Sequence, residues 1–195
     1  ARRDDLIEEL TRLALLYIDS LRVHYLSKRE KLGAEEWAFQ ICWRTLQWPT
    51  GTPEFALEEF AKRVSLSRLL EIYERAGAKG VKETVNGVAR SIPKFLPKGG
   101  FEEFGNFFVE IIRFAKENGG SLVRAFSRYT DARELERRVR EFPQIGPVLA
   151  PGIVRELRLA DIITLDISEL GISPADPVMR VLRRTGLVAE GCDSR

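Results

Sequence analysis

The chain has 195 residues, of which 44% are hydrophobic, so it is long enough to form one folding unit with a sizeable core. Its 31 basic and 29 acidic residues leave a net charge of only +2, with a pI near 8.6. This balance excludes a strongly basic coat for nucleic acid and confines any DNA contact to local groups.

The first two helices are predicted from apolar spacing. Residues 6–21 carry an amphipathic stripe, and Gly33 ends this helix. Residues 37–46 are apolar on nearly all sides, so we place this second helix at the centre of the fold. Pro49 and Gly51 stop it. Thr52 and Pro53 then have the residue types of an N-cap and a first helical position.

The later elements are predicted in the same way: apolar residues at helical spacing mark each helix, and Gly, Pro or Asn residues mark where it ends. They are a helix from Ser65 or Ser67 to near Gly77, a weakly amphipathic helix over 81–92, a loop over 93–100, an apolar helix over 101–115 that ends at Asn118 and Gly119, helices over 122–129 and 131–142, an irregular or turn-like run over 162–167, and a helix from Asp176 to Arg184 ended by Gly186. We therefore expect an all-α fold of about nine to eleven short helices.

Cysteine and histidine usage predicts a protein without metal or cofactor. Cys42 and Cys192 alone cannot ligate a four-cysteine iron–sulfur cluster or a structural zinc, and His24 has no second ligand at a suitable spacing. Cys42 lies in an apolar helix, where a buried free thiol is expected, and this fits a reducing compartment. With neither a membrane-spanning run nor a signal peptide visible, we expect a cytoplasmic protein, and no oligomer is implied. A single Met, three Asn and three Gln with 31% charged residues are typical of thermophilic proteins.

The most informative stretch is 141–157, where turn residues separate two amphipathic helical patterns. The apolar spacing on either side requires residues 143–147 to reverse the chain within about one turn. Such a reversal leaves backbone N–H groups unpaired at the start of the second helix, and these groups with the helix dipole form an anion site. A nucleic-acid phosphate is the expected occupant at Gly146, with the backbone of Gln144, Ile145 and Val148. The alternative is a tight turn that serves only packing.

From about Phe108 onward, three motifs in order resemble the helix-hairpin-helix DNA glycosylase superfamily, also called HhH-GPD. Residues 111–122 (IIRFAKENGGSL) mirror its helix with a glycine pair. Residues 142–150 (FPQIGPVLA) follow its hairpin, Leu-Pro-Gly-Ile-Gly-Pro-Lys-x-Ala. Residues 175–188 (ADPVMRVLRRTGLV) match the helix that carries its functional Asp. The resemblance implies a two-lobed helical fold that binds double-stranded DNA and excises damaged bases.

Two departures from the family pattern bear on activity. Bifunctional members attack the sugar with a hairpin Lys, but Val148 stands at that place and cannot form a Schiff base. Gln144 replaces the first hairpin Gly, at a position where a positive φ is expected and where a side chain costs about 1–2 kcal/mol. An enzyme with this hairpin is expected to release the base without lyase activity.

The resemblance assigns the catalytic carboxylate to Asp176, which could stabilise charge on the sugar and activate a water. Asp followed by Pro is also an ordinary helix start, so capping is the alternative role. Asp166 is the rival carboxylate because it lies closer to the hairpin in sequence.

Five arginines follow the hairpin and could hold phosphates on both sides of a cleft, although a solvated helix face is the commoner meaning of such charges. They are Arg155, Arg158, Arg180, Arg183 and Arg184. Gln47 and Trp48 are candidates for a wedge that stacks where a base leaves the duplex. The alternative is that Trp48 caps a buried helix.

The expected organisation is a helical lobe over 36–158, with the hairpin at about 131–157, and a second lobe made of 1–35 plus 159–195. Three functions stay open. The first is a monofunctional DNA N-glycosylase, and the second is a non-catalytic DNA-binding module. The third is a helical interaction domain without a nucleic-acid role.

Overall fold

The structure is a computed structural model that describes residues 2–167 and 170, and this part of the chain consists of helices joined by loops, without strands. The helices are α1 (Arg2–Leu32), α2 (Ala34–Gln47), the 3-10 helix η1 (Trp48–Thr50), α3 (Glu54–Arg63), α4 (Leu66–Ser91), α5 (Gly100–Glu117), α6 (Leu122–Ser127), α7 (Ala132–Arg140) and α8 (Leu149–Leu159). The all-α prediction is confirmed. None of the described helices combines the length and apolarity that crossing a bilayer requires.

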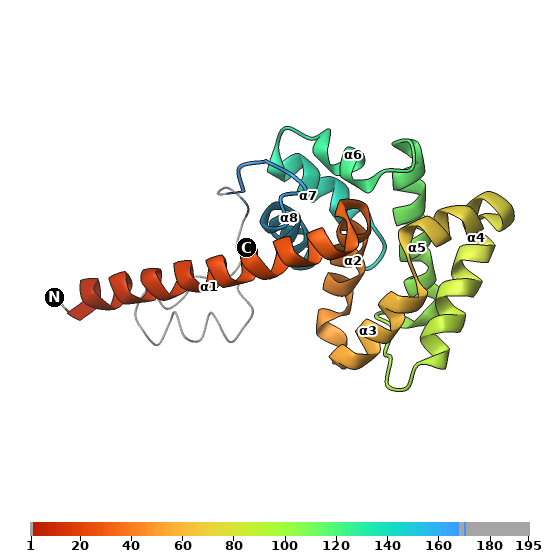
Figure 1. Cartoon of the computed structure of the whole chain (residues 1–195), viewed down its shortest axis with the longest axis horizontal. Coiled ribbons are helices and arrows are strands. Elements are labelled where there is room, and N and C mark those ends of the chain that lie inside the picture. Colours follow the sequence, from red (N-terminus) through yellow and green to blue (C-terminus); the bar gives the residue numbers. More distant parts are fainter. Residues whose placement is uncertain (1, 168–169, 171–195) are drawn as a thin grey trace.

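Two helices are long, and the first of them ends just before Gly33, as predicted. α1 has 31 residues and extends as a rod away from the other described helices (Figure 1). α4 has 26 residues because two predicted helices follow one another directly. The boundary expected near Gly77 is present as a break, where φ is 62° and ψ is −160°. Glycine reaches this backbone conformation without a steric cost from Cβ, so the chain bends here and resumes the helix at once.

The predicted start of α3 is wrong by one residue. Pro53, and not Thr52, occupies the N-cap position, with φ −65° and ψ 149°. The Thr52 hydroxyl is instead engaged by another loop: it donates to the Leu96 carbonyl at 3.2 Å and accepts from the Leu96 N–H at 3.1 Å. This pair of hydrogen bonds ties the segment before α3 to the loop after α4.

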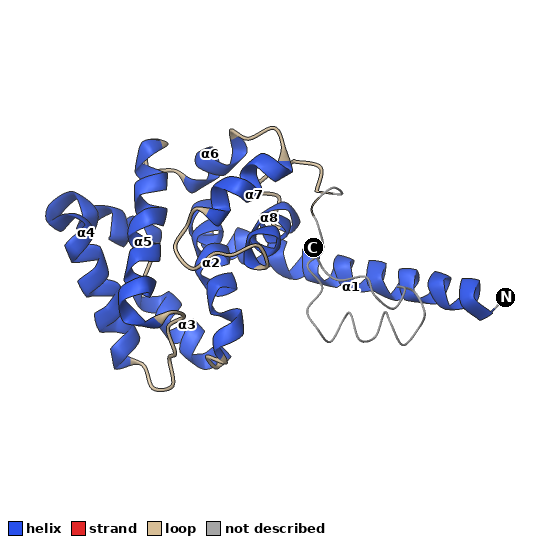
Figure 2. Cartoon of the chain, turned by 180° about the vertical axis from the view of Figure 1, so that it is seen from behind, coloured by secondary structure: helices blue, strands red, loops and turns tan. Residues whose placement is uncertain are grey.

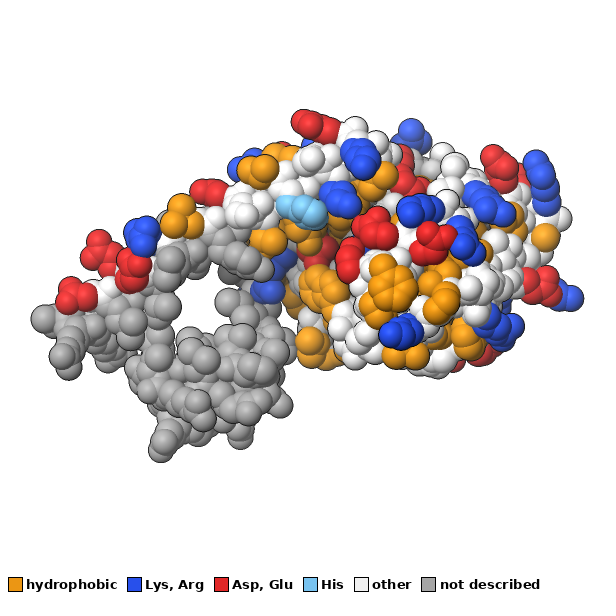
Figure 3. Space-filling model, turned by 60° about the horizontal axis from the view of Figure 1, so that its bottom comes forward, with side chains coloured by type: hydrophobic (Ala, Val, Ile, Leu, Met, Phe, Trp, Pro, Cys, Tyr) orange, Lys and Arg blue, Asp and Glu red, His pale blue; other side chains and the backbone are white. Residues whose placement is uncertain are grey.

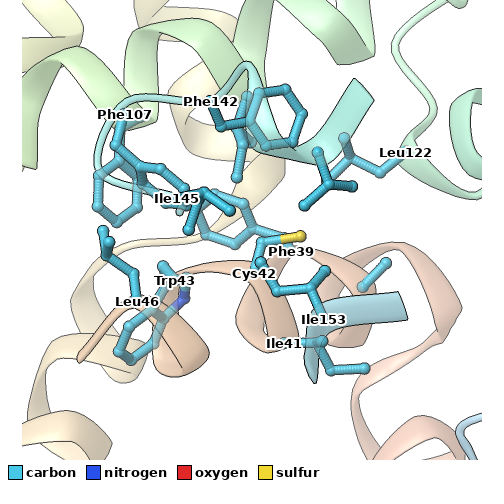
Figure 4. Close-up of a cluster of buried hydrophobic side chains, with 14 of the residues drawn as sticks. Phe39, Ile41, Cys42, Trp43, Leu46, Phe107, Leu122, Phe142, Ile145 and Ile153 are labelled. Carbon is cyan, nitrogen blue, oxygen red and sulfur yellow. The ribbon is translucent and has the colours of Figure 1, made fainter. Parts of the chain in front are cut away.

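The central position expected for the second helix is confirmed, because α2 is buried on nearly all sides (Figures 1 and 2). Its side chains pack against α5, α6, α8 and the segment after α7. Figure 4 shows Phe39, Cys42 and Leu46 of α2 among Phe107, Phe142 and Ile153. The Cys42 thiol is fully buried, as expected, and burial beside Glu156 raises its pKa.

Two adjacent carboxylates at the start of α2 cap two other helices. Glu35 accepts hydrogen bonds from the N–H groups of Leu122 and Val123, at 2.8 and 3.2 Å, where α6 begins. Glu36 accepts from the N–H of Leu66 at 2.9 Å, where α4 begins. Because unpaired N–H groups at a helix start favour negative charge, this pair fixes α4 and α6 against the central helix.

Candidate nucleic-acid interface

The helical hairpin predicted from the sequence is formed by α7 and α8, which pack against each other. α7 ends at Arg140 and α8 begins at Leu149. Between them, the Ile145 N–H donates to the Phe142 carbonyl at 3.0 Å. The Gly146 carbonyl then accepts from the N–H groups of Leu149 and Ala150, at 3.2 and 3.1 Å. The reversal is therefore a hydrogen-bonded turn that leads directly into the first turn of α8.

Two apolar side chains anchor this turn in the core. Phe142 packs edge-on against Phe114, with ring centroids 5.5 Å apart, and Ile145 points between α2 and α5 (Figure 4). The side chain of Ile145 is buried and its N–H is paired, so neither is available to a phosphate at this site. The turn therefore buries Phe142 and Ile145, and its outer part includes the backbone at Gly146 and the exposed Val148 side chain.

Gln144 adopts the positive φ predicted for this position, with φ 66°. A side chain in this conformation costs about 1–2 kcal/mol, and neighbouring contacts must offset that cost. Lys98 supplies one of them, since its Nζ donates to the Gln144 carbonyl at 3.0 Å. Partial burial lowers the pKa of Lys98.

The loop between α4 and α5 also packs closely on the Gln144 side chain. A Cβ added at Gly99 would lie 2.7 Å from Cδ of Gln144, so the glycine is what permits this approach. The roles of Lys98 and Gly99 as supports of the hairpin were missed by the sequence reasoning. The only local signal was a loop rich in Gly and Pro, which does not reveal its distant contact.

The outer part of the turn has backbone N–H groups that donate no hydrogen bond. The N–H groups of Gly146 and Val148 have no hydrogen-bond acceptor within the described part of the chain. A Cβ added at Gly146 would meet no atom within 4 Å, which shows that the space in front of this residue is open. The Val148 side chain is 58% exposed. This arrangement can accept an anion on backbone N–H groups at the start of α8.

The two wedge candidates lie in different environments. Gln47 is only 2% exposed, so its side chain is not offered to a duplex, whereas Trp48 is 58% exposed. The Trp48 ring lies over the first turns of α8, since a Cβ added at Gly152 would be 3.3 Å from its Cζ3 atom. The fold therefore brings one of the two candidates, Trp48, beside the hairpin.

Three loops meet around the hairpin, and we call them the three-loop face: residues 48–53, 92–99 and 142–148. The contacts Thr52–Leu96, Lys98–Gln144 and Trp48–Gly152 join them to one another and to α8. Each loop carries one large exposed apolar side chain: Trp48, Leu96 at 54% exposure, and Val148. Figure 3, in which the lower end of Figure 1 comes forward, shows exposed hydrophobic side chains among charged ones over that end of the molecule.

The predicted phosphate contacts of α8 lie away from this face. Arg158 is nine residues after the start of α8, about 14 Å along the helix axis. Its guanidinium donates to Asp161 at 3.2 Å, and Arg155 donates to the Leu170 carbonyl at 3.2 Å. Both side chains thus bind the segment that follows α8. Their contact with DNA stays a prediction.

Asp166, the rival carboxylate, is exposed and lines a cavity of about 480 Å³ with Arg22 and Arg158. This cavity lies between α1 and the end of α8, remote from the turn. Asp176, the preferred carboxylate, and the predicted phosphate contacts Arg180, Arg183 and Arg184 lie outside the described residues.

In comparisons with known proteins, no protein-family model, curated protein or solved structure matches this chain.

Proposed function

We propose that this protein binds duplex DNA through the three-loop face, with a backbone phosphate on the N–H groups of Gly146 and Val148. The observation that carries the proposal is the geometry of the turn. Gln144 holds the positive φ, the N–H groups of Gly146 and Val148 are unused, and the space before Gly146 is open. Backbone donors at a helix start suit a phosphate and carry no base preference.

The exposed apolar groups next to this phosphate site support a second contact. Trp48 can stack on a base that is displaced from the duplex, while Leu96 and Val148 border the same face. Because the net charge is only +2, binding is expected to rest on a few phosphates, to be modest, and to weaken steeply with salt.

As an enzyme, the protein would be a monofunctional DNA N-glycosylase acting on a damaged base. Asp176 would take a proton from a water whose oxygen bonds to C1′, while the bond from C1′ to the base nitrogen breaks. The base leaves with a proton, and the strand stays intact because Val148 has no amine. The exposed Val148 side chain has no nucleophilic group, so it also favours the second candidate, a DNA-binding module without catalytic activity.

Gly146→Val tests the DNA interface. The open space before Gly146 means that the variant should fold, while its side chain would cover the phosphate site. We expect weaker binding to duplexes of every sequence, measured by fluorescence anisotropy at fixed salt. Gly87→Val on α4 is the matched control, since a Cβ there also meets no atom within 4 Å. Equal affinity of the Gly146 variant and the parent would remove the hairpin from the interface.

A panel of duplexes, each with one damaged or mismatched base, separates enzyme from module. The glycosylase proposal expects strand breaks that need alkali, and it expects Asp176→Asn to abolish them while the fold survives. Breaks without alkali would show that an amine elsewhere acts as nucleophile. DNA binding without release of any base would support the non-catalytic module.

A further inference from the structure

The first helix is docked on the rest of the fold from the outside. Figures 1 and 2 show that only the C-terminal part of α1 lies against α2 and α8. Among its described apolar side chains, Tyr25 and Leu32 are partly buried and pack against the core, whereas the buried core itself begins at Trp37. Its two ion pairs with the other helices are part-exposed and therefore contribute little: Arg22–Asp161 at 3.6 Å and Lys28–Glu58 at 3.5 Å. α1 can thus detach while the other helices stay packed.

A single residue, Gly33, joins α1 to α2. Its φ is 85° and its ψ is 154°, a backbone conformation that glycine reaches without a steric cost from Cβ. A Cβ added at Gly33 would meet no atom within 4 Å, so the space around the junction is open. Gly33 is therefore suited to act as a hinge for α1.

Beneath the docked part of α1 lies a buried carboxyl group, that of Glu156 on α8. The residue is only 7% exposed, and its Oε1 atom has no hydrogen-bond partner among the described residues. Tyr25 of α1 hydrogen-bonds to this carboxyl group and also packs on the Trp37 ring, with centroids 5.6 Å apart. A buried charge costs much free energy unless water or further donors reach it, and detachment of α1 would admit water.

We propose that Glu156 makes the docking of α1 sensitive to pH: α1 stays on α2 and α8 while the carboxyl group is neutral, and it swings away about Gly33 when the group ionises. In the docked state, burial raises the pKa of Glu156 to about 8, although Tyr25 and Thr45 favour the charged form. Once α1 leaves, water reaches the group and its pKa returns towards the ordinary 4.5.

The direction of the pH effect follows from these two pKa values. Between pH 4.5 and pH 8 the docked state holds a proton on Glu156 that the detached state has released. Each pH unit in this window therefore raises the equilibrium constant for detachment, by up to about tenfold. Above pH 8 both states are ionised, and the dependence levels off.

Other polar groups on the helices around Glu156 keep one charge state or have partners of their own. On α2, burial raises the pKa of Cys42, so the thiol stays neutral, and the Arg44 guanidinium stays charged. On α7, the buried carboxylate Glu136 pairs with Arg140 of the same helix. α1 contributes the Tyr25 hydroxyl and, at the edge of the interface, the exposed His24 ring, 5.9 Å from the Tyr25 ring.

Native-state hydrogen exchange of the whole chain tests the proposal at pH 6, 7 and 8 with increasing urea. Amides of residues 25–32 should exchange faster than those of α5 and with little dependence on urea, because α1 opens alone. The exchange rate of these amides divided by that of Glu156→Gln cancels the intrinsic pH dependence of exchange. We expect this ratio to rise at least about tenfold from pH 6 to pH 8. Exchange of α1 only together with α5, or a constant ratio, would overturn the proposal.

Further variants separate Glu156 from its neighbours. Tyr25→Phe removes a hydroxyl that favours the charged form, so it should increase detachment more at pH 8 than at pH 6; an equal effect at both would contradict the proposal. His24→Gln is the essential control, because histidine also titrates in this range, and it should keep the parent's pH dependence. Loss of the dependence in His24→Gln would overturn the assignment to Glu156. Gly146→Val should behave as the parent, since this inference does not rest on DNA binding.

Discussion

The ammonium group of Lys98 donates a hydrogen bond of 3.0 Å to the carbonyl oxygen of Gln144, although the two residues are 46 positions apart in the chain. The loop before α5 thereby supports the strained residue of the hairpin. A candidate phosphate site made of backbone atoms depends on such support, because its donors must keep their direction without help from side chains of their own.

Lys98→Met is expected to lower the free energy of unfolding by about 1–2 kcal/mol, because the part-buried Gln144 carbonyl loses a charged donor. Urea denaturation measures this loss. Lys94→Met is the matched control: Lys94 is an exposed residue of the same loop, and its change should stay within about 0.5 kcal/mol. Equal losses in both variants would show that the contact to Gln144 contributes nothing specific.

Gln144→Gly should be more stable than Gln144→Ala by about 1 kcal/mol. Both variants lose the side-chain amide that packs on Gly99, but only alanine keeps a Cβ at φ 66°. Thermal and urea unfolding of the two variants give the comparison. If the alanine variant is equally stable, the backbone at this position is not held in the left-handed region in solution.

Glu35→Ala is expected to cost about 2–3 kcal/mol, since it removes the carboxylate that accepts from Leu122 and Val123 and from the Ser121 hydroxyl. The loss of amide protection should concentrate in α6, which hydrogen exchange can follow. Glu71→Ala on the exposed side of α4 controls for removal of a carboxylate. A uniform loss of protection over all helices would contradict a local capping role.

Glu156→Gln should change how stability depends on pH. Glu156 on α8 is 7% exposed, and burial raises its pKa from an ordinary 4.5 to about 8, although Tyr25, Thr45 and Arg44 favour the charged form. Between these two pH values the folded state holds a proton that the unfolded state has released. Rising pH therefore destabilises the parent by about 1.4 kcal/mol per unit in this window.

The glutamine variant lacks this titration, so its stability relative to the parent should increase from pH 4.5 to pH 8 and then level off. Urea unfolding at a series of pH values measures the difference, with Glu30→Gln on the exposed face of α1 as the control. A constant difference between parent and Glu156→Gln across this range would show that the carboxyl group is not buried as the fold implies.

For the described residues, the sequence by itself determined which segments are helical and which helix is central. Helix formation depends on apolar spacing and on caps within a few residues, such as Ser65, whose hydroxyl accepts from the Arg68 N–H. Residues 37–46 are apolar on nearly all sides of their helix, and this pattern alone predicted that the helix is buried. The positive φ of Gln144 was readable because a local motif prescribes local backbone geometry.

Tertiary structure decided which groups meet, because contacts between distant segments depend on how the helices dock. Gln47 is buried while the adjacent Trp48 is exposed, because consecutive helical residues point about 100° apart and the Gln47 side faces the core. Thr52 leaves its expected capping role for Leu96, and Arg158 is engaged by Asp161. Lys98 carried no signal in the sequence. Its role follows from packing, which placed its ammonium group beside the strained Gln144 carbonyl.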